Sequence, residues 1–151
     1  MLLISDEKTL SREIDSLRKL GKLINFIPTM GNLHLGHSSL FKKSENTKEI
    51  RVVSIFVNPL QFNDDKDFYN YPRTIESDKK KLLAEEVDVL FLPDAQIIDV
   101  VKFEFRLGHI ARKLCGVDRS SHFEGVAKII LKFLDIIKPD SITLGEKDYQ
   151  V

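Results

Sequence analysis

The hydrophobic residues of this chain recur at helical spacing in some segments and in short unbroken runs in others. Residues 10–20 carry leucine and isoleucine at helical spacing, and Gly21 follows as a helix stop. Residues 23–27 and 51–57 are mainly apolar runs of the kind found in buried parallel strands. A helical pattern from about residue 38 to residue 46 separates them. The first part of the chain therefore predicts helix, strand, helix, strand.

The two patterns continue beyond a polar loop at residues 58–72, whose length is typical of functional loops. Residues 126–137 carry apolar side chains at helical intervals, and Pro139 ends this predicted helix. Residues 103–115 are ambiguous, strand-like at their start and helical towards their end. The remaining predicted elements are a helix over 74–86 capped by Thr74, a strand over 87–92 and a strand over 141–144.

Strands that alternate with helices predict an α/β fold: a parallel sheet with right-handed crossovers and flanking helices, in one domain over residues 1–151. Ligands of such sheets bind beyond the carboxyl ends of the strands, where the strand order switches. Polar clusters follow three of the predicted strands, at residues 28–37, 58–61 and 145–148. We expect the three clusters to form one composite nucleotide site.

Composition narrows the class of protein. Hydrophobic residues make up 42% of the chain, enough for a packed core. The 23 Lys and Arg balance the 23 Asp and Glu, so a general nucleic-acid-binding role is not expected. The single Cys115 cannot form an internal disulfide, which suits a reducing compartment. Residues 1–4 are too short for a signal-peptide core and no apolar run reaches membrane-spanning length, so we expect a cytoplasmic protein without a membrane partner.

The segment Pro28-Thr29-Met30-Gly31-Asn32-Leu33-His34-Leu35-Gly36-His37 carries the strongest chemical signal. It reads as the end of a strand, a glycine turn and the start of a helix, where unpaired N–H groups and the helix dipole attract anions. His34 and His37 at such a position can bind the phosphates of a nucleotide and stabilise the charge that develops as pyrophosphate leaves. Two alternatives remain: turn histidines bonded to the backbone, or a metal site completed by His109, His122 or carboxylates.

The other two clusters supply different groups. Asn58 and Gln61 carry amides suited to a small substrate with hydroxyl and carboxylate groups, although Asn-Pro also opens ordinary turns. Gly145 permits close approach of a ligand, Lys147 can meet phosphate, and Asp148 can accept hydrogen bonds from a ribose. The alternative for residues 145–148 is a solvated turn.

Three further side chains are candidates for charge recognition. Arg73 and Arg119 could pair with a carboxylate or a phosphate, or lie on the surface as most arginines do. Asp78 could help to hold Mg²⁺ through water, or be a solvated residue on a helix face. The run 79–81, three lysines, is expected to face water.

Taken together, these stretches resemble the pantothenate synthetase (pantoate–β-alanine ligase) family. The resemblance extends from about Leu23 to the last residue, and the order and spacing of its motifs are specific. The motifs are residues 26–37, Val53-Ser54-Ile55-Phe56-Val57-Asn58-Pro59-Leu60-Gln61-Phe62, Asp67-Phe68 with Tyr71-Pro72-Arg73-Thr74, His122-Phe123-Glu124-Gly125-Val126 and Gly145-Glu146-Lys147-Asp148.

The resemblance implies a Rossmann-like member of the H-x-G-H nucleotidyltransferase superfamily. It also implies a two-step ligase reaction. Pantoate attacks the α-phosphate of ATP, giving pantoyl adenylate and pyrophosphate with Mg²⁺, and β-alanine then displaces AMP to give pantothenate. The family's habit of pairing through this domain implies a homodimer.

Matched to this family motif by motif, the chain acquires expected site residues. His37 matches the proton donor, and Gln61 the glutamine shared by pantoate and β-alanine. Asn58, Pro28, Thr29 and Arg119 are expected on the substrate side. The expected ATP-binding residues are Met30, Gly31, Asn32, Leu33, His34, Leu35, Gly36, His37, Gly145, Glu146, Lys147 and Asp148.

The chain also departs from the family pattern. Val151 stands where the family has a second glutamine that contacts pantoate, and a Ser-Ser-Arg motif and a C-terminal lid domain are absent. We expect a partial ATP and pantoate surface with little or no turnover by the chain alone. The alternatives are another H-x-G-H adenylyltransferase, acting on a phosphopantetheine or nicotinate nucleotide, and a non-catalytic module for nucleotide binding or dimerisation.

Overall fold

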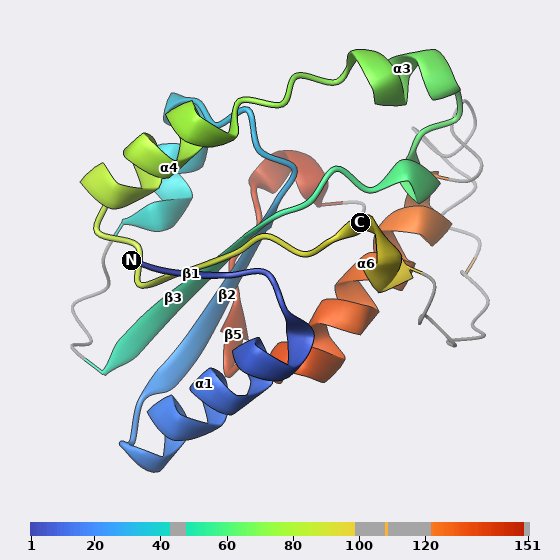
Figure 1. Ribbon diagram of the computed structural model, residues 1–151. Helices are drawn as coiled ribbons and strands as arrows, with labels where there is room; N and C mark the ends of the chain where they lie inside the picture. Colours follow the sequence, from blue (N-terminus) through green and yellow to red (C-terminus); the bar gives the residue numbers. More distant parts are fainter. Residues whose placement is uncertain (43–47, 99–107, 109–121, 150–151) are drawn as a thin grey trace.

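Five parallel strands form the centre of the molecule in the computed structural model, which describes residues 1–42, 48–98, 108 and 122–149 (Figure 1). Their spatial order is β1-β4-β3-β2-β5. The predicted α/β class with a parallel sheet is confirmed. The strands are β1 (Leu2–Ile4), β2 (Leu23–Thr29), β3 (Glu49–Ile55), β4 (Val89–Phe91) and β5 (Ser141–Ile142).

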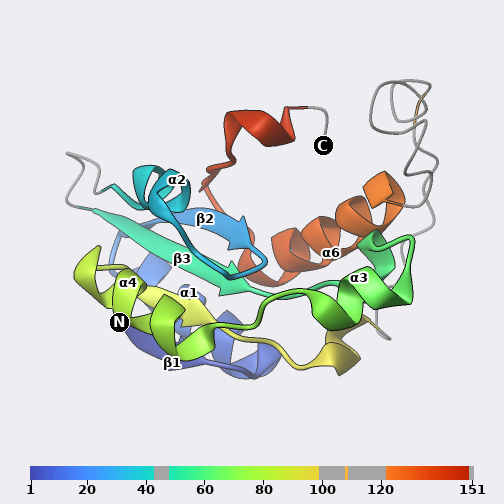
Figure 2. The same ribbon diagram turned by 90° about the horizontal axis from the view of Figure 1, so that it is seen from above.

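Helices cover both faces of this sheet (Figures 1 and 2). One face is covered by α1 and α6, and the other by α4 and the turn that carries α2. The helices of the described residues are α1 (Glu7–Lys19), α2 (Leu35–Ser38), α3 (Asp65–Asn70), α4 (Ile75–Ala84) and α6 (His122–Ile137), with 3₁₀ turns at Ser39–Phe41, Pro59–Gln61, Ala95–Ile98 and Glu146–Asp148. No helix in these ranges is both long and apolar enough to cross a membrane.

The strands divide their apolar side chains between two cores. Phe26 and Val52 pack towards α1 and α6, together with Phe133. Their chain neighbours Ile27 and Val53 point to the opposite face, towards α4. Successive side chains of a strand alternate between faces, so an unbroken apolar run fills both cores at once. This is why the runs seen in the sequence predicted buried strands.

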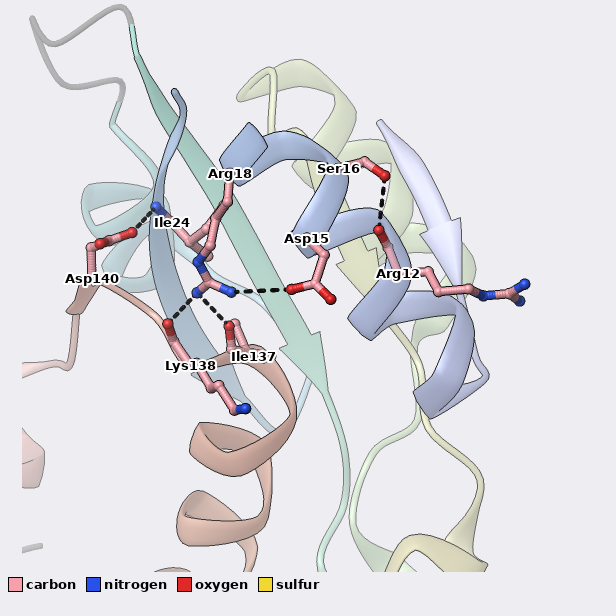
Figure 3. A network of polar contacts seen from close by, with 8 residues as sticks. All are labelled: Arg12, Asp15, Ser16, Arg18, Ile24, Ile137, Lys138 and Asp140. Carbon is pink, nitrogen blue, oxygen red and sulfur yellow. Dashed lines mark hydrogen bonds and ion pairs between the residues drawn. The ribbon is translucent and has the colours of Figure 1, made fainter. Parts of the chain in front are cut away.

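Two polar anchors fix the position of β5 beside β2 (Figure 3). Arg18, in the last turn of α1, donates to the carbonyl of Ile137 at 2.8 Å and to that of Lys138, at the end of α6. Asp140 accepts the N–H of Ile24 at 2.7 Å through its carboxylate. These hydrogen bonds therefore hold both ends of the short connection between α6 and β5. It enters β5 in register with β2, Ser141 opposite Asn25.

The boundaries differ from the prediction where local signals were weak. Strand β1 was not predicted; among the described residues it pairs with β4 alone, as a three-residue edge strand. The predicted loop 58–72 contains the 3₁₀ turn Pro59–Gln61 and helix α3. The predicted helix 38–46 is replaced by α2 and the 3₁₀ turn Ser39–Phe41. Helix α4 ends at Ala84 because the chain turns at Glu86, whose φ is 55°. Residues 103–115, with Cys115 and His109, lie outside the described residues apart from Gly108.

Strand order places a ligand crevice between β2 and β5. From β2 the chain steps to β3 and β4 on one side, whereas β5 lies on the other side of β2. The connections from the two strands therefore diverge at this point, and the space beyond their carboxyl ends is left open.

Candidate nucleotide and acid site

A cavity of about 840 Å³ lies beyond the carboxyl ends of β2 and β5 and extends along α6. The structure brings all three polar clusters of the sequence to this one cavity. The predicted site residues that line it are Pro28, Thr29, Met30, Gly31, Asn32, His34, His37, Gln61, Gly145, Lys147 and Asp148. Its size is in the range of cavities that hold small-molecule ligands.

The turn after β2 is held by the buried carboxylate of Asp78, on α4. The two oxygens accept the N–H groups of Asn32 and Leu33, each at 2.9 Å, and one also accepts the Thr74 hydroxyl at 3.1 Å. Gly31 has a φ of 80°, and a Cβ there would lie 3.1 Å from the Asp78 carboxylate and 2.9 Å from a methyl carbon of Ile55. Glycine at this position allows the turn to close on Asp78.

Two predictions need correction here. The N–H groups at the start of the helix were expected to be free for phosphate, but His37 Nδ1 accepts that of His34 and His34 Nδ1 accepts that of Gly36. In the preceding turn, Asp78 accepts two more and the Thr29 hydroxyl accepts that of Gly31. Asp78 was expected to help hold Mg²⁺, but it is 1% exposed and faces backbone donors. No group of three or more His, Cys, Asp or Glu among the described residues could hold a metal ion. These side chains do not by themselves fit a Mg²⁺ site.

Asp78→Asn is expected to destabilise the fold by about 1–3 kcal/mol, because one turn N–H would then face an amide N–H instead of an acceptor. Urea denaturation without Mg²⁺ measures this loss. Glu76→Gln is the matched control, since Glu76 forms an exposed ion pair with Lys79 on the same helix, 2.8 Å long. An effect of Asp78→Asn seen only with Mg²⁺ present would contradict the positioning role.

The local fold sets the tautomers of the two histidines. His34 Nδ1 accepts the N–H of Gly36 at 3.1 Å, and His37 Nδ1 accepts the N–H of His34 at 3.3 Å. A neutral imidazole that accepts at Nδ1 carries its proton at Nε2. Both rings therefore have an N–H donor at Nε2, and their centroids lie 4.1 Å apart. The prediction of paired imidazole donors agrees with this geometry, and the backbone-bonded alternative accounts only for the Nδ1 atoms.

Burial lowers the pKa of His37 below its ordinary value, and the neighbouring His34 and Lys147 lower it further. Asp148 and Asp78 act in the opposite direction but less strongly. His37 is therefore neutral at neutral pH and donates a hydrogen bond without carrying a full charge. Lys147 and Asp148 line the same cavity as His34 and His37, which places the 145–148 corner beside the H-x-G-H turn, as the composite site requires.

Gln61 is held in the cavity wall by the N-terminal part of α6. Asn58 Nδ2 donates to the Gly125 carbonyl at 2.9 Å, while Asn58 Oδ1 accepts the Leu60 N–H at 3.1 Å. His122 Nδ1 lies 2.9 Å from the backbone carbonyl oxygen of Gln61. Asn58 was expected to bind substrate; it is 1% exposed and does not line the cavity, so its role is to tie Gln61 to α6.

Other predicted residues take structural positions. Arg73 donates to the carbonyls of Phe68, Tyr69 and Tyr71 at 3.0–3.2 Å, so it caps α3 instead of facing the cavity. Of the lysine run expected in water, Lys81 donates to the Leu33 carbonyl. The remaining predicted ATP residues Leu33, Leu35, Gly36 and Glu146 do not line the cavity, and Arg119 and Val151 lie outside the described residues.

The buried side chain of Arg51 stabilises the chain next to the site, a role that the sequence did not predict. Its side chain is 2% exposed, donates to the carbonyls of Phe41, Glu85 and Glu86 and pairs with Asp88 at 3.5 Å. It thus ties the turn after the histidines to the end of α4. In the sequence it is one polar residue in an apolar run, and nothing nearby indicates its partners.

The cavity also includes residues not predicted to bind ligand. Tyr71 and His122 line it, with apolar side chains of α6 such as Ile130. His122 entered the sequence argument only as a metal alternative and as part of a motif. Its position opposite Gln61 depends on the packing of α6, which local sequence does not reveal.

The crevice between β2 and β5, the H-x-G-H turn and the adjoining Gly-Glu-Lys-Asp corner define a Rossmann-like α/β domain with the fold of the H-x-G-H nucleotidyltransferases. Comparison with known proteins identifies the family: a family model described as Pantoate-beta-alanine ligase matches residues 2–151. The chain belongs to the pantoate–β-alanine ligase family.

Individual relatives support this assignment to the family. A pantothenate synthetase from Thermodesulfovibrio yellowstonii is 46% identical over 142 residues, covering 92% of this chain and 51% of the relative. One from Alteromonas mediterranea is 41% identical over 155 residues, covering 99% of this chain and 55% of the relative. The chain spans about half the length of the curated relatives it matches.

A solved structure shows the same fold. It is the crystal structure of pantoate-beta-alanine ligase from Francisella tularensis, complexed with beta-gamma ATP and beta-alanine. It superposes with a TM-score of 0.89 at 42% identity, over 99% of this chain and 58% of that chain.

Proposed function

We propose that this chain binds ATP and pantoate for the condensation of pantoate with β-alanine through a pantoyl-adenylate intermediate, giving pantothenate, AMP and pyrophosphate. The observation that carries the proposal is the single cavity shared by the H-x-G-H turn, Gln61 and the Gly-Glu-Lys-Asp corner. Family membership supports the choice of acid and amine and argues against another H-x-G-H adenylyltransferase. The relative from Francisella tularensis, whose structure is described as a complex with beta-gamma ATP and beta-alanine, supports these two ligands.

In this proposal the cavity residues divide the work by chemistry. The Nε2–H groups of His34 and His37 donate to the phosphates, and they stabilise the charge that moves onto pyrophosphate as it leaves. Lys147 meets the same phosphates as a point charge; its side chain is 73% exposed, and its Nζ lies 3.9 Å from the Asp148 carboxylate. Asp148 accepts from the ribose, and the Gln61 carboxamide orients the pantoate carboxylate beside the α-phosphate. Positioning of the two reactants supplies much of the rate.

The proposal also covers the metal ion, the compartment and the oligomeric state. Because the described side chains do not form a metal site, any Mg²⁺ would be held mainly by ATP phosphate oxygens and water. We also propose that the protein acts in the cytoplasm as a homodimer, as the resemblance implies, with Pro28 and Thr29 on the pantoate side of the cavity.

The experiment is pantoate-dependent exchange of labelled pyrophosphate into ATP by the 151-residue chain. Exchange requires reversible adenylate formation and a specific acid, and it needs no amine. Exchange that depends on pantoate supports the proposal. ATP binding in a calorimeter without exchange would instead favour a non-catalytic nucleotide-binding module, and exchange without pantoate would point to another acid.

A further inference from the structure

A smaller cavity of about 400 Å³ adjoins the main one, and four residues line both. Met30, Gln61, Tyr71 and His122 thus form a shared wall, and the amide of Gln61 contacts the sulfur of Met30 within it. The two cavities therefore lie side by side, with these four side chains at their common boundary. The smaller cavity therefore suits a second reactant.

The hydrogen bond of His122 fixes its tautomer. A backbone carbonyl can only accept, so His122 Nδ1, 2.9 Å from the Gln61 carbonyl oxygen, must carry a proton. In the neutral ring Nε2 then holds a lone pair. This polarity is opposite to that of His34 and His37, whose Nδ1 atoms accept and whose Nε2 atoms donate. Of the three described histidines that line the cavities, His122 alone has its proton fixed at Nδ1.

The charged side chain that lines the smaller cavity is an acidic one. Asp67, in the first turn of α3, contributes a carboxylate, and the described lining includes no lysine or arginine. The remaining lining residues beyond the shared wall are Phe62 and Asn63. A primary ammonium group suits this lining, since Asp67 attracts its charge and an unprotonated ring nitrogen can accept its proton.

We propose that His122 Nε2 is the general base that deprotonates the incoming amine, which enters through the smaller cavity. This inference rests on the proposed function, because it assigns the second step of that reaction. Nε2 takes one proton from the ammonium group of β-alanine, and the freed nitrogen lone pair attacks the acyl carbon of the pantoyl adenylate. The bond from that carbon to the phosphate oxygen then breaks, AMP leaves with the electron pair, and the second nitrogen proton passes to water.

The test separates the base from its structural hydrogen bond. His122→Asn keeps an N–H donor at the place of Nδ1, so it preserves the bond to the Gln61 carbonyl and removes only the Nε2 lone pair. With pantoyl adenylate supplied to the chain, we expect aminolysis by β-alanine to slow about 100-fold in this variant, the scale of general base catalysis. Aminolysis by hydroxylamine, which is unprotonated at neutral pH, is expected to change by less than about threefold, and added imidazole is expected to restore part of the β-alanine rate.

The outcomes are distinguishable. Equal rates for the variant and the unmodified chain, a parallel loss with both nucleophiles, or no acceleration by the unmodified chain would each overturn the inference. Pyrophosphate exchange uses no amine, so a loss of exchange in His122→Asn as large as the loss of β-alanine aminolysis would assign His122 to positioning Gln61 and overturn the base assignment. A chain that lacks exchange but still shows the His122-dependent aminolysis would refute adenylate formation and leave the base assignment standing.

Discussion

His37→Ala is expected to lower the rate of pantoyl-adenylate formation by about 100- to 1000-fold, the usual effect of removing one preorganised donor from a developing anion. The reason is geometric. The backbone of the turn already occupies His37 Nδ1, so its Nε2–H is left to face the cavity. Burial keeps the ring neutral, and the donor therefore needs no proton from solvent before the reaction. Single-turnover measurement, with the chain in excess over ATP, detects even a slow first step.

Two variants at the same position isolate the donor from the turn. His37→Asn places a carboxamide oxygen near the position of Nδ1, keeping the acceptor for the His34 N–H, but it lacks the Nε2 donor. We expect it to be as slow as His37→Ala. His37→Gln carries an N–H near Nε2 and is expected to recover part of the rate. Leu35→Ala is the neutral control, because Leu35 is 90% exposed in the same turn. An unchanged rate in His37→Asn would remove the assigned role.

The main strands and the long helix of this fold could be predicted from sequence because they fill both cores. Residues 23–27 and 51–57 lie within or overlap β2 and β3, and the pattern over 126–137 lies within α6. Gly21 also ends α1 as predicted, with a φ of 71° and the N–H of Lys22 bonded to the Leu17 carbonyl. These features depend on local spacing, which the sequence displays directly.

The polar supports of the site could not be predicted because their partners are distant in the chain. Asp78 bonds to residues 45 and 46 positions away, and Asn58 to one 67 positions away. A sequence shows that a carboxylate or amide is present, but not whether it faces backbone donors, a metal or substrate. The three strand exits were predicted to meet because parallel topology requires it. Which side chains at those exits remain free depends on tertiary hydrogen bonds.

Gly125→Ala is expected both to destabilise the protein and to displace Gln61, the residue proposed to orient the pantoate carboxylate. A Cβ on Gly125 would lie 2.3 Å from the Leu60 carbonyl oxygen and 2.7 Å from the Gln61 nitrogen. These are backbone atoms, and Asn58 holds them against the helix through its bond to the Gly125 carbonyl, so neither side can yield without moving Gln61. Overpacking of this kind costs about 1–3 kcal/mol, and a displacement near 1 Å at a reacting group can cost about 100-fold in rate.

Whether Gly125→Ala lowers or raises the free energy of unfolding distinguishes the contact with the turn from helix propensity. Alanine in place of glycine inside a helix ordinarily stabilises by about 1 kcal/mol, so a loss of stability at Gly125 reports the contact with the turn and not helix propensity. Gly21→Ala is the matched control: its Cβ would meet nothing within 4 Å, although its φ of 71° is strained for alanine. We expect it to lose about 1–2 kcal/mol through that strain, with pyrophosphate exchange unchanged. Urea denaturation and pantoate-dependent exchange measure both effects, and a Gly125→Ala variant more stable than the unmodified chain would show that α6 does not hold Gln61 in place.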